Sequence, residues 1–105
     1  MDAPIGAVWD AIYDSAAWPR WWRGVVRATK LREGDDDGVG ALWRFTWRSR
    51  LPYDLEFESE TTRVERPHLL EGRARGELRG VGRWRLYEGR GTAVVYEWDF
   101  ERSTS

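Results

Sequence analysis

The sequence predicts one α+β domain, residues 1–105, in which two N-terminal helices precede an antiparallel sheet of about six strands. Three observations support this prediction. Apolar residues near the N-terminus recur at helical spacing, most of the remaining chain alternates apolar with charged residues, and short glycine-containing turns separate the alternating segments. No linker, internal repeat or low-complexity segment divides the chain, so a single domain is expected.

The first predicted helix begins near Pro4, because proline suits the first helical turn. Its apolar residues follow i, i+3, i+4 and i+7 spacing and form one buried stripe of Ile5, Val8, Trp9 and Ile12. Asp14 and Ser15 end this helix and can cap a second one. Pro19 disfavours helical geometry at Trp18, so we expect the second helix to last a turn or two at most.

Six strands are predicted after the helices, over residues 25–32, 41–50, 53–65, 69–76, 79–88 and 92–102. The first of them has no clear inward face. Pro52 cannot donate a backbone hydrogen bond, which predicts a bulge or an edge position between the second and third strands. The segment Gly89-Arg90-Gly91 predicts a tight hairpin before the last strand.

The predicted sheet has one aromatic and one charged face, because successive side chains of a strand point to opposite sides. The aromatic face carries our candidate ligand-lining residues, which are Trp43, Phe45, Trp47, Tyr53, Phe57, Trp84, Tyr96 and Trp98. On the other face, arginines such as Arg44 and Arg85 neighbour acidic residues of adjacent strands, which indicates a solvated surface. An antiparallel sheet needs a cover on one face only, so the functional question is what lies on the aromatic face.

Composition excludes several classes of function. A net charge of −1 lacks the electrostatic footprint of a nucleic-acid-binding protein. The absence of cysteine excludes disulfides, thiolate nucleophiles and cysteine zinc sites. No apolar run has membrane-spanning length and the N-terminus lacks a signal-peptide pattern, so we expect a cytoplasmic protein without membrane insertion. Arginine greatly outnumbers lysine, of which Lys30 is the only one, and this indicates a GC-rich, bacterial genome.

Few residues suggest catalysis or metal binding. His68 is the single histidine, and it follows Pro67 in a predicted turn with no residue identified to orient it. The three aspartates at residues 35–37 lack the alternating ligand spacing of a calcium loop. We therefore expect no metal and no cofactor, and the sequence assigns no catalytic residue.

The aromatic face allows two interpretations. Aromatic residues on one side of a strand are most often core, yet 8 Trp in 105 residues is many for so small a core. A concave aromatic surface with a few polar groups is also typical of an apolar ligand pocket. Small residues share the inward parity of Trp84 at Gly72, Ala74, Gly76, Gly80 and Gly82. They leave room for a packed helix or for a ligand, and both interpretations stay open.

Motifs spread over nearly the whole chain point to a known superfamily. They are Ala3-Pro4-Ile5-Gly6-Ala7-Val8-Trp9-Asp10-Ala11-Ile12, Trp18-Pro19-Arg20-Trp21-Trp22, Gly38-Val39-Gly40, Leu51-Pro52-Tyr53, Gly76-Glu77-Leu78-Arg79-Gly80-Val81-Gly82-Arg83-Trp84 and Gly91-Thr92. Together they resemble the START/polyketide-cyclase-like (SRPBCC, helix-grip) superfamily. The resemblance implies a curved antiparallel sheet that grips a long C-terminal helix around a hydrophobic cavity for lipids, sterols or polyketides. The usual first strand and C-terminal helix have no counterpart in this sequence, so we expect a truncated form of that fold.

Three hypotheses for function follow. The favoured one is binding of an apolar small molecule, such as a lipid, sterol or polyketide, on the concave aromatic face. The second is a polyketide cyclase or aromatase in which Tyr53 or Tyr96 orients a carbonyl group, and an inward carboxylate or histidine would favour it. The third is a protein-interaction module, which a flat, filled face would favour. Because the aromatic face lacks a cover, we expect either a homodimer or an additional C-terminal helix.

Overall fold

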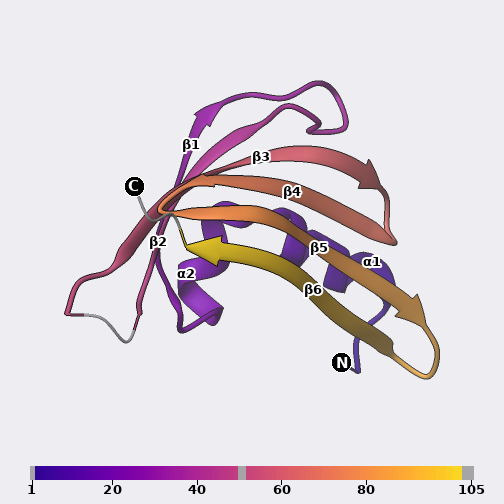
Figure 1. Cartoon of the computed structure of the whole chain (residues 1–105). Coiled ribbons are helices and arrows are strands. Elements are labelled where there is room, and N and C mark those ends of the chain that lie inside the picture. The colour runs from indigo at the N-terminus through magenta and orange to yellow at the C-terminus, as the bar shows by residue number, and fades with distance from the viewer. Residues whose placement is uncertain (1, 50–51, 103–105) are drawn as a thin grey trace.

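The computed structural model describes residues 2–49 and 52–102, and it confirms the α+β prediction (Figure 1). The helical segment comprises α1 (Ile5–Tyr13), the 3-10 turn η1 (Ser15–Ala17) and α2 (Trp18–Trp21). The strands are β1 (Val25–Arg32), β2 (Leu42–Trp47), β3 (Leu55–Glu65), β4 (Leu69–Gly76), β5 (Leu78–Glu88) and β6 (Thr92–Arg102). In Figure 1 the sheet curves around the helical segment.

The strands form one sheet in the order β1-β2-β3-β4-β5-β6, and each pairs antiparallel with its neighbour. Three of them, β1, β4 and β6, have the bounds that the sequence predicts. The second strand is shorter than the predicted 41–50, and position 50 lies outside the described residues. Tyr53 lies in a bend before β3 rather than in the strand, which agrees with the break predicted at Pro52.

Helix α1 packs on the aromatic face through its predicted apolar stripe. Val8, Trp9 and Ile12 are buried with Leu70 of β4 and Leu86 of β5. Every buried apolar side chain in such a cluster contributes roughly 1.5–3 kcal/mol relative to exposure. The stripe therefore fixes α1 against the beginning of β4 and the end of β5.

The second helical element differs from the expectation in one respect. Trp18 has helical backbone angles, φ −53° and ψ −40°, although it precedes Pro19. The proline falls in the first turn of α2, where its missing N–H leaves no intrahelical bond unmade. The indole N–H of Trp18 donates to the carbonyl of Ile12 at 2.9 Å, which ties α2 to the end of α1.

The helical segment covers part of the face that the sequence leaves open. The ring of Trp18 stacks on Phe45 of β2, with centroids 5.0 Å apart and planes 11° apart, and both residues are buried. Beyond this cover, Trp98 on the edge strand β6 remains 62% exposed. The aromatic face is therefore covered over β2 and stays open around Trp98.

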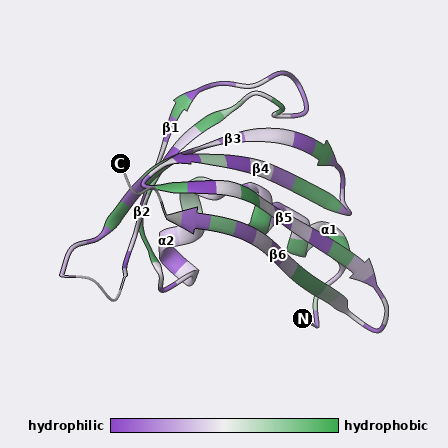
Figure 2. Ribbon diagram, in the orientation of Figure 1, coloured by the Kyte–Doolittle hydropathy of each residue, from purple (hydrophilic) through white to green (hydrophobic). Residues whose placement is uncertain are grey.

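The opposite face carries the predicted ladders of opposite charge. Arg44 lies 3.4 Å from Glu58, and Arg85 lies 2.5 Å from Glu97. The alternation of hydrophilic and hydrophobic residues along the strands is visible in Figure 2. Such exposed pairs contribute only about 0–1 kcal/mol each, so they favour the strand register and solvation more than stability.

Candidate functional site

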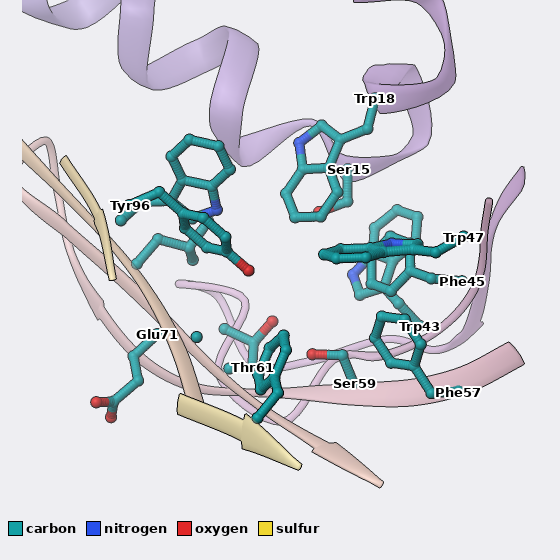
Figure 3. Close-up of a pocket in the computed structure, with 15 residues that line it drawn as sticks. Ser15, Trp18, Trp43, Phe45, Trp47, Phe57, Ser59, Thr61, Glu71 and Tyr96 are labelled. Atoms are coloured by element: carbon teal, nitrogen blue, oxygen red, sulfur yellow. The ribbon is translucent and has the colours of Figure 1, made fainter. Parts of the chain in front are cut away.

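A narrow cavity of about 50 Å³ lies between the aromatic face and the helical segment (Figure 3). Trp18 closes it from the helical side, while Phe45, Trp47 and Phe57 line it from β2 and β3. Trp84 and Tyr96 line it from β5 and β6. These six lining side chains are aromatic, so an apolar and ring-shaped group finds stacking partners on several sides.

A wider cleft of about 560 Å³ adjoins this cavity. The two share the lining residues Ser15, Trp43, Thr61 and Leu70. The mouth of the cleft lies between the α1–η1 junction and the loop that joins β1 to β2. Its volume falls within the range of about 300–1,000 Å³ that is typical of small-molecule sites.

Hydrogen bonds order the loop at the mouth. The hydroxyl of Tyr13 in α1 donates to the carbonyl of Asp37 at 2.8 Å and connects the helix to the loop. The carboxylate of Asp35 accepts from the backbone N–H groups of Asp37 and Val39 at 2.9 and 3.0 Å. The Nζ of Lys30 lies 5.2 Å from the centre of the Trp43 ring. The rim of the cleft is therefore polar, whereas its inner end is aromatic.

Trp22, which follows α2, joins the aromatic walls of β2, β5 and β6. Its ring centroid lies 5.1 Å from that of Trp47, 5.5 Å from that of Trp84 and 5.6 Å from that of Tyr96. The rings of Trp84 and Tyr96 are 4.4 Å apart. Aromatic pairs in this range contribute about 0.5–1.5 kcal/mol beyond their buried area, so contacts between the rings add to the packing of the cluster.

Four hydroxyl groups interrupt the aromatic lining. They belong to Ser15, Ser59, Thr61 and Tyr96 and lie around the cavity in Figure 3. Within the described part of the chain, none of these four hydroxyls has a hydrogen-bond partner. The buried indole N–H of Trp47 also lacks one. The Trp47 N–H is buried, whereas the four hydroxyls are open to the cavity and can bond to whatever enters it.

The pKa values of two titratable groups at the cavity are shifted, one upward and one downward. Burial raises the pKa of Tyr96 to about 12, so its phenol is neutral at physiological pH. Glu71 borders the cavity, but its carboxylate points away from it in Figure 3. The hydrogen bond from Arg83, at 2.6 Å, is the main cause that lowers the pKa of Glu71. Among the described lining residues, therefore, no charged group faces the cavity.

A comparison with protein families identifies one whose model matches residues 1–104 and is described as "Polyketide cyclase / dehydrase and lipid transport". The chain belongs to this family. This family is one of the SRPBCC superfamily that the sequence motifs resemble, so this prediction is confirmed. No curated protein matches the chain.

The family fold is also found in a solved structure. The crystal structure of DR_A0006 from Deinococcus radiodurans has a TM-score of 0.76 and 18% sequence identity to this chain. The match covers 97% of this chain and 77% of that one. At this identity the likeness concerns the fold alone. Family membership itself suggests hydrophobic ligand binding or cyclase activity.

The structure brings together six of the eight residues that the sequence suggests as ligand-lining candidates. They line the narrow cavity and are Trp43, Phe45, Trp47, Phe57, Trp84 and Tyr96. The other two lie elsewhere, because Tyr53 is 51% exposed in the bend before β3 and Trp98 is exposed beside Phe100. Contact of any of them with a ligand stays a prediction.

Sequence reasoning missed the hydroxyls of Ser59 and Thr61. The two-residue period of β3 carries the signal, because both positions share the parity of Phe57.

His68 is exposed, and its Nδ1 lies 3.2 Å from the carbonyl of Leu86, outside the cavity. The described residues contain no group of acidic or histidine side chains placed to hold a metal ion. None of the described helices is long and apolar enough to cross a membrane.

Proposed function

We propose that this chain binds an apolar small molecule, such as a lipid, sterol or polyketide, in the cleft between the sheet and the helical segment. The observation that carries this proposal is the continuity between the aromatic cavity and the wider cleft. The cleft provides about 560 Å³ of space at its mouth, and the aromatic walls offer apolar contact at its inner end. The suggestion of hydrophobic ligands by the family supports the same function.

A cyclase or aromatase is the second candidate. It rests on the Tyr96 hydroxyl, which can donate a hydrogen bond to a carbonyl oxygen in the cavity. General acid–base catalysis also needs a group that takes up or releases a proton near the operating pH. The neutral Tyr96 and the outward Glu71 do not supply one, so the described lining favours binding over catalysis. The hollow shape of the face also favours a small molecule over a protein partner.

Native mass spectrometry of the purified protein tests the binding function. We expect a bound apolar molecule as a discrete added mass that organic extraction removes. Extracted protein should then bind an added probe such as 2-naphthol. A homogeneous apo mass, together with no uptake of any apolar probe by the extracted protein, would contradict the proposal.

We also propose that a second copy of the chain covers the open part of the aromatic face near Trp98. Trp98 is 62% exposed, and a two-fold axis would allow the surface around it to cover itself. An additional helix after β6, as the resemblance implies, would cover the same surface. Sedimentation velocity over a dilution series separates these cases, because a monomer at low micromolar concentration would contradict the dimer. The cytoplasmic location stays a prediction.

A further inference from the structure

Two directly paired glycines form the floor of the cavity. Gly72 of β4 and Gly82 of β5 are register partners, and both line the cavity. A Cβ atom at Gly72 would lie 2.9 Å from the hydroxyl oxygen of Ser59, and one at Gly82 would lie 2.9 Å from that of Tyr96. The space that two side chains would occupy is therefore taken by two hydroxyl groups.

These hydroxyls reach the glycine pair from opposite sides. Ser59 belongs to β3, which neighbours β4, while Tyr96 belongs to β6, which neighbours β5. The Cβ positions of directly opposed residues in an antiparallel pair are about 4.5–5.5 Å apart. Each hydroxyl therefore lies over one of two neighbouring positions of the floor. Figure 3 shows both hydroxyls at the cavity.

Core packing alone does not explain this arrangement. Alanine at position 59 and phenylalanine at position 96 would give the same apolar contacts without a polar atom at the cavity. Neither Ser59 nor Tyr96 has a hydrogen-bond partner for its hydroxyl among the described residues. Two unpartnered hydroxyls beside one glycine floor are the features expected of a polar subsite in an otherwise apolar pocket.

We propose that the hydroxyls of Ser59 and Tyr96 bind a neutral oxygen atom of a planar, ring-containing ligand, and that the cleft therefore selects oxygenated ring compounds over hydrocarbons of the same shape. This inference rests on the proposed binding function. The two hydroxyls also set the orientation of the ligand, because Ser59 and Tyr96 line the narrow cavity and not the wider cleft. The oxygen enters the narrow end first, and the bulk of the ligand fills the wider cleft.

The charges of the lining residues indicate that the ligand oxygen bound here is neutral. Among the described residues that line the narrow cavity there is no lysine, arginine or histidine. The neutral phenol of Tyr96 can donate to a carbonyl or accept from an alcohol, but it cannot balance a full negative charge. An alcohol, phenol or ketone therefore fits this end of the site, whereas a buried carboxylate or phosphate would remain unpaired.

The test compares three probes of similar shape by equilibrium dialysis: naphthalene, 2-naphthol and 2-naphthoate. A purely apolar pocket prefers naphthalene, because burying an unpaired hydroxyl is costly. We expect 2-naphthol to bind tighter than naphthalene, and 2-naphthoate to bind weakest at neutral pH. Tyr96→Phe and Ser59→Ala should each weaken 2-naphthol by about 2- to 12-fold, the equivalent of one neutral hydrogen bond. Both variants should leave naphthalene within about twofold.

Tyr87→Phe is the matched control, because Tyr87 is an exposed tyrosine of β5 outside the cavity lining. It should change none of the three affinities. Equal binding of naphthalene and 2-naphthol, with no effect of Ser59→Ala or Tyr96→Phe, would overturn the polar subsite and leave apolar binding intact. Tightest binding of 2-naphthoate would overturn the neutral-oxygen assignment. If no probe binds, both this inference and the binding function are wrong.

Discussion

Gly82→Ala tests the glycine floor with the smallest possible change, a single methyl group. The backbone of Gly82 is not in the left-handed region, so alanine introduces no backbone strain. Its Cβ would lie 2.9 Å from the hydroxyl of Tyr96 and 3.1 Å from Cζ of Phe100. Both are the far ends of rings on β6, so they must tilt away from the floor to make room.

The expected cost follows from two opposing effects. Overpacking by a methylene group in a well-packed region typically costs about 1–3 kcal/mol. Replacing glycine by alanine reduces the conformational entropy of the unfolded chain and stabilises by about 0.4–1 kcal/mol. Their difference leaves a net destabilisation of roughly 0–2.6 kcal/mol, with a central value of about 1.3 kcal/mol. The displaced Tyr96 hydroxyl should also reduce the preference for 2-naphthol over naphthalene.

Urea unfolding followed by tryptophan fluorescence measures the stability change, and dialysis measures the probe preference. Gly89→Ala in the β5–β6 hairpin is the control, because a Cβ there has nothing within 4 Å. In a Tyr96→Phe background the cost of Gly82→Ala should fall, since one of the two clashing atoms is gone. If Gly82→Ala is as stable as Gly89→Ala and keeps the full preference for 2-naphthol, the floor does not position the Tyr96 hydroxyl.

Three further predictions concern other parts of the site. Trp47→Arg or Trp84→Arg should abolish binding of an apolar probe that quenches tryptophan fluorescence, whereas Arg48→Ala should not; equal effects would refute the assignment of faces. His68→Ala should change the free energy of unfolding by less than about 0.5 kcal/mol and leave probe binding intact, because His68 is exposed; a loss of binding would place it in the site. Stability should fall between about pH 10 and 12, because the unfolded chain ionises Tyr96 near its usual pKa of 10.0 whereas the folded chain holds that pKa at about 12. Tyr96→Phe should make this decline shallower by at most about 3 kcal/mol, and an unchanged decline would contradict the burial of the phenol.

The elements of this fold could be predicted because their hydrophobic periods are strong. Val8, Trp9 and Ile12 fall on one helical face, and the same residues are buried in the structure. Strands with clean alternation, such as β6, have the predicted bounds. The prediction was weaker where proline intervenes. Trp18 is helical before Pro19 because α2 starts there and the proline falls in its first turn.

The walls of the site could be predicted in part, but its cover could not. Strand parity places Trp47 and Phe57 on one face without any tertiary knowledge. The stacking of Trp18 on Phe45 depends on how the helical segment returns to the sheet, and no local pattern encodes that contact. Ser15 is similar, since its sequence context indicates a helix cap, yet the structure buries it at the junction of cavity and cleft.

The inward glycines illustrate why parity alone left the function open. From the sequence, Gly72 and Gly82 leave room for either a helix or a ligand. In the structure, side chains of the neighbouring strands occupy that room instead, and the atoms that approach most closely are hydroxyl oxygens. A floor built only to receive a helix would favour apolar contacts, because the apolar face of a helix offers a hydroxyl no hydrogen-bonding partner. Polar atoms over the glycine pair therefore favour a ligand with an oxygen of its own, and the Gly82→Ala and Tyr96→Phe variants measure that preference directly.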